Sequence, residues 1–465
     1  MQVTRAGVCA ATLVACSTPP DLGPFSDPGA VAQQGQYVTL YYHPPAVPCA
    51  GSLPYLDANA KAIADYLGVS LKTQIPYHYN NALPCVSEAY GCTATATGEP
   101  PTVWANAPNI VHELVHAVQF QNGPVDVSFV NESVAVALGD IEYNGVPAGV
   151  SDDTLLSADP LPGDDYPIAG DFGSYLLTRF GAAPFEALAA AAVKGSTPDE
   201  VEADFASAYG ETMTALRADR QASSASFLRD RIGLSECYAI APDPNVADGG
   251  TVNETLGCDT NGVGVEQDTM FRFVPFDVPA DGLYKVALSV PDGGYAELTG
   301  CGMLTEVDWG LAEPAGAGTA LVLGYFPAGR YSLWITAPAT STVAFPFAVT
   351  PVVLGTAATC ASVPTVEVPP GTTAIVVFSM LPAPLEFPLR VGTNVAAVEW
   401  AGLQSTAQVC LGGCDVDCVE ATTSLAVVDG GVDVTSPVLE AGVTYALKAQ
   451  LNGPQGYIVV DLEGN

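Results

Sequence analysis

The stretch His112-Glu-Leu-Val-His116 carries the clearest chemical signal in the sequence. Histidines four residues apart lie on the same face of a helix, so both imidazoles can reach one tetrahedral metal ion. Glu113, next to the first histidine, can then take a proton from water at the ion's open position. The stretch therefore predicts a Zn²⁺ site in which Glu113 is the general base.

The residues around this motif predict the helix that it requires. Pro108 suits a first helical position, and Asn122-Gly-Pro124 ends the segment. The apolar residues at helical spacing beside the histidines are Ile110, Val111, Leu114, Val115 and Val118. The alternative is an amphipathic helix with two exposed histidines and no metal.

A zinc site also needs a third protein ligand. The segment Ser128 to Gly139 predicts a second helix, and its Glu132 lies sixteen residues after His116. That distance allows the chain to reverse and bring the second helix under the metal. Asp140 and Glu142 are rival ligands that follow the helix, and Glu132 could instead only interact with the helix dipole.

His112 to His116 followed by Val130-Asn-Glu-Ser-Val-Ala135 resembles the gluzincin arrangement, in which the third ligand lies in a segment of Glu-Gly-x-Ala type. Ser133 stands where those proteins often have glycine. Helix-forming segments between Tyr166 and Arg220 are similar to the helical tail of peptidase MA-like gluzincins. The resemblance covers roughly residues 37 to 223 and implies a zincin-like α+β domain with Zn²⁺ held by His112, His116 and Glu132.

The resemblance implies metal-assisted hydrolysis of peptide bonds. Zn²⁺ would activate water and polarise the carbonyl, while Glu113 takes a proton and later delivers it to the leaving amine. Such sites usually hold a second donor to the oxyanion. Tyr166, which opens the next helix, is the candidate, and Tyr175 is the alternate, although either could be a packing residue.

Other branches of zinc peptidases fit the sequence less well. A metzincin would carry glycine and histidine where this chain has Gln119 and Asn122. Thermolysin-like enzymes carry an aspartate four residues after the ligand glutamate, where this chain has Val136. Support for a ligand histidine is therefore expected from Asp140 or from a backbone carbonyl.

The composition excludes some partners. The 465 residues predict two or three domains, and 14 basic against 50 acidic residues give a net charge of −36. A phosphate field would repel such a chain, so neither nucleic acid nor an anionic membrane surface is an expected partner. The charge by itself indicates solubility in a salty or extracellular setting, with weak surface binding of Ca²⁺ a lesser alternative.

The N-terminus predicts export. Arg5 precedes the apolar run Ala6 to Ala15, which is too short to span a bilayer but suits a signal peptide. Leu13-Val-Ala-Cys16 resembles the lipobox of bacterial lipoproteins, which implies cleavage before Cys16 and acylation of its thiol. Ser17 then favours the outer membrane. Simple secretion and a misplaced start site are the alternatives.

Cysteine usage agrees with export. Of twelve cysteines, two lie in the N-terminal apolar segment, and the other ten predict about five disulfides formed in an oxidising compartment. Cys85 and Cys92 flank a short loop and are expected to pair with each other. Cys49 then needs a partner elsewhere, and Cys237 is a candidate.

Several other elements can be predicted. Strands are predicted at Tyr37 to His43 and at Thr73 to Tyr79, and Pro76 favours a sheet edge for the second of them. A helix is predicted at Leu53 to Leu67, ending at Gly68. Thr102 to Ala105 is predicted to be an edge strand beside which an extended peptide could lie. His43 and His78 are interpreted as packing or surface residues.

From Cys237 onward the alternation of apolar and β-branched residues between Gly and Pro turns predicts an all-β half. The predicted strands include Phe271 to Val278, Tyr284 to Val290, Ala320 to Tyr325 and Tyr331 to Thr336. The segment Thr372 to Val391 weakly echoes Thr269 to Val290, which predicts two β-sandwich domains.

The sequence as a whole predicts a multidomain protein. Its segments are a lipoprotein signal peptide at 1–16, a flexible tether at 17–35, a zincin-like metallopeptidase domain at 36–236, and β-sandwich domains at 237–352 and 353–465. We expect a secreted or surface-anchored bacterial zinc peptidase that acts on peptides or proteins and touches the membrane only through its lipid anchor. The alternatives are a catalytically silent metal-binding surface lipoprotein and an adhesion or structural β-sandwich protein.

Overall fold

In the computed structural model the chain forms two compact units, residues 1–240 with 258–270 and residues 241–257 with 271–465. The described residues run from 29 to 463, and the gaps longer than five residues are 80–90, 140–151, 223–232, 243–250, 302–308, 312–317, 352–365, 412–417 and 436–444. In 309–325 and beyond 351 the strands are described by their backbone. The helices and several separate sheets confirm the predicted class of a multidomain α+β chain.

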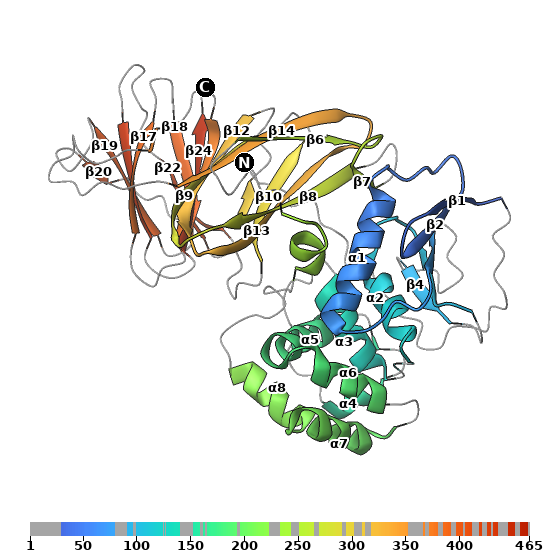
Figure 1. Ribbon diagram of the computed structural model, residues 1–465. Coiled ribbons are helices and arrows are strands. Elements are labelled where there is room, and N and C mark those ends of the chain that lie inside the picture. Colours follow the sequence, from blue (N-terminus) through green and yellow to red (C-terminus); the bar gives the residue numbers. More distant parts are fainter. Residues whose placement is uncertain are drawn as a thin grey trace. The chain divides into compact units, whose positions relative to one another are not determined.

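The first unit contains a mixed sheet, in which Figure 1 labels β1, β2 and β4, and its strand order is β1-β2-β3-β5-β4. Its strands are β1 (Val31–Gln34), β2 (Val38–Tyr42), β3 (Ile75–Tyr79), β4 (Gly91–Ala94) and β5 (Thr102–Ala105). β2, β3 and β5 run parallel, whereas β1 and β4 are antiparallel to their neighbours. β1 lies in the segment predicted to be a tether, because its short, mostly exposed Val-Ala-Gln-Gln sequence gives no apolar alternation to recognise.

Two predictions of edge strands were wrong. β5 pairs with β3 on one side and with β4 on the other, so β4 is the last strand in the described order. β3 lies between β2 and β5, although it contains Pro76. The ladder between β3 and β5 begins at Tyr77, so the proline, which has no N–H, lies outside that ladder. Sequence alone does not fix which strands become neighbours.

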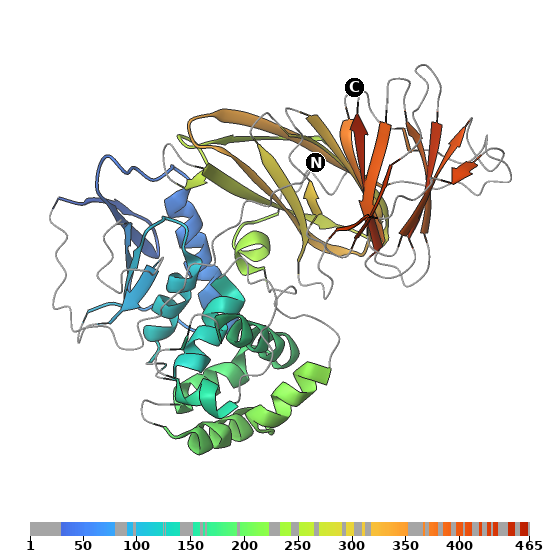
Figure 2. The same cartoon turned by 180° about the vertical axis from the view of Figure 1, so that it is seen from behind.

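The first unit also contains the helices. They are α1 (Ser52–Leu67), α2 (Val111–Phe120), α3 (Ser128–Gly139), α4 (Asp152–Ser157), α5 (Tyr166–Phe180), α6 (Ala182–Ala191), α7 (Pro198–Tyr209) and α8 (Met213–Ala222), followed by a π-helical turn at Leu234–Tyr238. The predicted end of α1 is confirmed, because Gly68 adopts the left-handed conformation at φ 70°. α7 and α8 lie at the end of this unit farthest from the sheet, as the view from behind also shows (Figure 2). Among the described residues, no helix is both long and apolar enough to cross a membrane.

A disulfide joins Cys49 to Cys258, so the prediction that Cys49 pairs with Cys237 was wrong. The segment 258–270 returns to the first unit, where the backbone of Gly264 bonds Cys49 N at 2.9 Å and the Ser52 hydroxyl at 3.0 Å. No sequence pattern marks this return. Cys92, Cys237 and Cys301 are also disulfide-bonded. Cys85 lies outside the described residues.

Glu186 on α6 predicts a pH-dependent stability. Its Oε1 atom is buried without a hydrogen-bond partner among the described residues, and burial raises the pKa of the carboxyl from 4.5 to about 7. Since the folded pKa exceeds the unfolded one, this group stabilises the fold below about pH 4.5, and that contribution is lost as the pH rises through about 7. We expect Glu186→Gln to stabilise the protein by roughly 1–2 kcal/mol at pH 8 and to change little at pH 4. Urea unfolding at both pH values measures the difference, and a gain independent of pH would contradict it.

The second unit is built of strands. They are β6 (Thr251–Gly257), β8 (Thr269–Val278), β9 (Gly282–Val290), β10 (Tyr295–Gly300), β11 (Trp309–Leu311), β12 (Gly318–Phe326), β13 (Gly329–Pro338), β14 (Thr342–Pro351), β15 (Val366–Glu367), β16 (Thr372–Ser379), β17 (Leu385–Val391), β18 (Ala397–Gly402), β19 (Ser405–Leu411), β20 (Cys418–Glu420), β21 (Ala426–Val428), β22 (Gly431–Thr435), β23 (Tyr445–Leu451) and β24 (Gly456–Glu463), while β7 (Val263–Gly264) belongs to the returning segment of the first unit.

These strands form three sheets. One contains β11-β10-β13-β8, a second runs β21-β22-β18-β24-β16-β12-β9-β14-β6, and a third runs β15-β17-β23-β19-β20. Phe276, Tyr331 and Phe347 are buried together, with Phe276 stacked on Tyr331 at 5.8 Å between ring centroids. The division into domains at 237–352 and 353–465 stays a prediction. β12 and β16 lie on opposite sides of the proposed boundary between residues 352 and 353 in the chain, and they pair in parallel in one sheet.

Candidate metal centre

α2 begins three residues later than the sequence predicts. Its first residue is Val111, and Pro108 lies in the turn before it. The Tyr77 hydroxyl of β3 holds this turn, because it donates to the carbonyl of Ala107 at 2.8 Å and accepts from the N–H of Ile110 at 3.0 Å. A side chain from the sheet therefore occupies the place of a helix cap, and it fixes where the histidine helix starts.

α2 and α3 approach each other closely beside the first histidine. A Cβ added to Gly139 of α3 would lie 2.6 Å from the Cα atom of His112, so only glycine fits there. Between α5 and α3, a Cβ on Gly173 of α5 would lie 2.2 Å from the Ser133 carbonyl oxygen. Two glycines thus let α2 and α5 pack closely against α3, the helix that carries Glu132.

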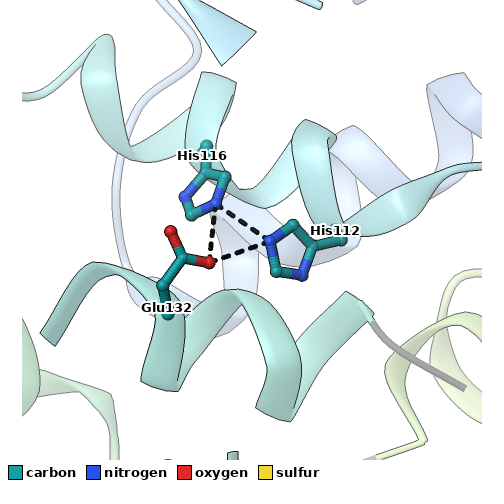
Figure 3. Close-up of side chains that lie close together, drawn as sticks. All are labelled: His112, His116 and Glu132. Atoms are coloured by element: carbon teal, nitrogen blue, oxygen red, sulfur yellow. Dashed lines mark hydrogen bonds and ion pairs between the residues drawn. The ribbon is translucent and has the colours of Figure 1, made fainter. Parts of the chain in front are cut away.

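Three ligand atoms converge between α2 and α3 (Figure 3). Nε2 of His112 lies 3.1 Å from Nε2 of His116, and Oε2 of Glu132 lies 3.0 Å from the first nitrogen and 3.4 Å from the second. Ligands bound tetrahedrally to Zn²⁺ at their usual lengths are about 3.3 Å apart. All three residues are at most 4% exposed. The donor types and their separations therefore fit a small divalent cation, although they do not identify the metal.

The polarity of the cluster also fits a cation. Oδ1 of Asn131 accepts a hydrogen bond from Nδ1 of His116 at 2.9 Å, so Nε2 faces the cluster and can offer its lone pair to a cation when it carries no proton. Burial would raise the pKa of Glu132, but the charges and hydrogen bonds of His116 and His112 outweigh it and lower the pKa to about 2. The carboxylate is therefore ionised at neutral pH. A bound cation can interact with all three converging acceptor atoms at once. A hydrogen on Nε2 of His112 can be donated to only one of the other two atoms at a time.

Asn131 is the site residue that sequence reasoning missed. Support for a ligand histidine was expected from Asp140 or a backbone carbonyl, but Asp140 and the rival ligand Glu142 lie outside the described residues. The available signal was a side-chain amide directly before the proposed ligand glutamate. Asn131 also begins a glycosylation sequon, but it is only 8% exposed and is engaged with His116.

We expect Asn131→Ala to weaken metal binding by about 10–100-fold, because the acceptor that orients His116 is lost. Asn131→Asp keeps an acceptor at the same position and should retain affinity. Isothermal titration of the metal-free protein with Zn²⁺ measures both variants, with Asn122→Ala, an exposed asparagine, as the matched control. Equal affinities for Asn131→Ala and wild type would contradict this role.

Glu113 follows His112 and is 3% exposed. Burial raises the pKa of its carboxyl, while the nearby His112 and His116 oppose the rise. The Thr93 hydroxyl of β4 is its hydrogen-bond partner, 3.0 Å from Oε2. The strand that lies last in the described sheet thus contacts the proposed general base.

The two candidate tyrosines have different surroundings. Tyr166 is fully buried at the start of α5, and its ring is stacked 6.0 Å from that of His112. The Tyr175 hydroxyl instead donates to Asp219 at 2.5 Å and accepts from Arg179 at 3.0 Å. Only Tyr166 is therefore placed beside the cluster.

The remaining histidines stay outside the cluster of His112, His116 and Glu132. His78 is stacked between Tyr41 and Trp104 across β2, β3 and β5, at centroid distances of 4.6 and 5.7 Å. His43 is half-buried after β2. Cys16, the expected lipidation site, lies outside the described residues.

Comparisons with known proteins add no family. No family model matches the chain, and no curated protein matches it. A conserved protein of unknown function from Pseudomonas aeruginosa PAO1 is similar at 10% identity over 46% of this chain and 100% of its own, with a TM-score of 0.14. An anti-sigma factor domain-containing protein is similar at 10% identity over 47% of this chain and 85% of its own, with a TM-score of 0.15. Similarities this weak indicate neither a fold nor a function. The assignment of a candidate metal centre therefore depends on the geometry of the three converging side chains.

Proposed function

We propose that this chain is a zinc-dependent peptidase of gluzincin type with a zincin-like catalytic domain. The observation that carries the proposal is the convergence of His112, His116 and Glu132 from two packed helices, with Glu113 in the same turn as the first histidine. Two imidazoles and one carboxylate form the protein ligand set of several catalytic zinc sites, which leave a coordination position open. The Asn131 contact supports the same assignment, since ligand histidines usually donate their other N–H to an oxygen.

The residues have distinct roles in the proposed reaction. Zn²⁺, when bound, supplies Lewis acidity and makes water a better nucleophile at neutral pH. Glu113 takes a proton from the water that attacks the peptide carbonyl, and it delivers that proton to the amine nitrogen as the C–N bond breaks. Tyr166, beside His112, is the candidate donor to the carbonyl oxygen as negative charge develops there.

The proposed setting is outside the cytoplasm. The Cys49–Cys258 disulfide and the other disulfide-bonded cysteines support an oxidising compartment. An N-terminal lipid anchor on Cys16 and a place in a bacterial cell envelope remain part of this proposal, because they depend on the lipobox-like sequence. Peptides or unfolded proteins are the proposed substrates.

Metal analysis and a peptide screen test the proposal on the purified full chain. We expect about one zinc per chain, cleavage products from a peptide library by mass spectrometry, loss of cleavage with a chelator and recovery with Zn²⁺. Zinc without cleavage of any peptide or unfolded protein would instead support a silent metal-binding protein. A chain that binds no metal would leave only an adhesion or structural role.

A further inference from the structure

We propose that Thr93 on β4 is a positioning residue for Glu113, an inference that rests on the proposed peptidase function. The Thr93 hydroxyl oxygen lies 2.7 Å from the backbone oxygen of Glu113 and 3.0 Å from Oε2 of the same residue. Both residues are buried, Thr93 at 4% exposure and Glu113 at 3%. One hydroxyl therefore contacts the two ends of the proposed general base.

A second observation shows that β4 is built to approach Glu113. Gly91 lies two residues before Thr93 and points to the same face of the strand. A Cβ on Gly91 would lie 2.6 Å from Cγ of Glu113. β4 thus has Gly91 beside Cγ of Glu113 and the Thr93 hydroxyl beside its carboxylate. Contacts at both places restrict the rotamers that the Glu113 side chain can adopt.

The hydroxyl suits both protonation states that a general base passes through. It can donate its single hydrogen to the ionised carboxylate. When Glu113 holds the proton taken from water, the same hydrogen can turn to the backbone carbonyl, 2.7 Å away, and the oxygen can accept from the carboxylic acid. Rotation of one O–H bond is therefore enough to keep the Thr93 hydroxyl bonded to Glu113.

Holding a general base in position should raise kcat more than substrate affinity. A threonine that merely ties β4 to α2 would affect stability instead. The two roles are separable, because serine keeps the hydroxyl without the methyl group, and valine keeps the volume without the hydroxyl. Thr39 on β2, whose hydroxyl donates to Gln74 at 3.1 Å, offers a matched Thr→Val control on another strand.

The test compares Thr93→Val, Thr93→Ser and Thr39→Val with wild type in the full chain. Zinc content, thermal unfolding, kcat and KM on a cleaved peptide, and affinity for a hydroxamate are measured. For Thr93→Val we expect unchanged zinc, a KM within about twofold and a kcat lower by about 10–100-fold. Thr93→Ser should restore kcat to within about threefold of wild type, and Thr39→Val should match wild type. Thr93→Ala replaces Thr93→Val if the valine variant does not fold.

Hydroxamate binding separates this proposal from the proposed function. A hydroxamate chelates Zn²⁺ and releases a proton that Glu113 can accept, so Thr93→Val should bind it about tenfold more weakly than wild type and Thr93→Ser about as well. If the wild-type protein cleaves no peptide, the proposed peptidase function is overturned. The hydroxamate affinities of the Thr93 variants still test whether Thr93 positions Glu113. Wild-type kcat and hydroxamate affinity in Thr93→Val, or an equal loss in Thr93→Ser, would overturn the positioning role.

Discussion

Replacing Glu113 by glutamine is expected to lower kcat by about 10³–10⁴-fold while zinc content stays near one per chain. Glutamine has nearly the same shape but cannot take a proton from water at neutral pH, so the proposed reaction loses its general base. Glu113 is not among the three converging ligand atoms, which is why the metal should remain. Metal analysis and steady-state kinetics on one protein preparation measure both effects.

Although Glu113→Gln should lower activity, it should raise the stability of the metal-free protein at high pH. Burial raises the pKa of the Glu113 carboxyl, so its ionised form is disfavoured in the folded, metal-free protein. The stability that this group contributes is present at low pH and is lost as the pH rises. Glu113→Gln should therefore unfold at a higher temperature than wild type at pH 8 in the presence of a chelator, as expected where activity requires a destabilising group.

Glu211→Gln is the matched control, because Glu211 is exposed in the turn before α8. It should leave kcat, zinc content and unfolding temperature unchanged. A Glu113→Gln protein that retains wild-type kcat would show that another group accepts the proton, and one that loses zinc would show that Glu113 helps to hold the metal.

His116→Ala should remove the metal and all hydrolysis together. Apparent zinc affinities in four-ligand sites correspond to about 3–4 kcal/mol for each ligand, so losing one donor should weaken binding on the order of 10³-fold. The variant also leaves Oδ1 of Asn131 without the ring nitrogen that it contacts at 2.9 Å. Titration of the metal-free protein with Zn²⁺ and metal analysis after dialysis measure the loss.

His116→Ala should also reduce stability above about pH 5. His116 is a major reason that the pKa of Glu132 is lowered to about 2, and a lowered carboxyl pKa stabilises the fold above its unfolded value of 4.5 and loses that effect as the pH falls through 2. The variant should lose part of this contribution at neutral pH. His43→Ala, at a half-buried histidine outside the cluster, is the matched control. Full zinc content in His116→Ala would rule out the proposed ligand set.

The positions of α2 and α3 show how far a local pattern reaches. The sequence predicts both helices because apolar residues recur at helical spacing and because glycine follows each of them, and the structure has them at Val111–Phe120 and Ser128–Gly139. The start of α2 was misplaced, since its position depends on a hydroxyl from Tyr77, which lies in a distant strand. A contact of that kind leaves no trace in the periodicity around the helix.

By itself the sequence determined the candidate ligand types and their spacing, namely two histidines one helical turn apart and an acid on the next helix, because the period of the α-helix converts spacing into a shared face. Only the tertiary structure decided which side chains complete the centre. Asn131 reaches His116 where α3 packs on α2, and Thr93 reaches Glu113 where β4 packs on α2. The return of Cys258 to Cys49, 209 residues away in the chain, was decided in the same way. Such pairings depend on packing between segments far apart in the chain, which local periodicity does not encode.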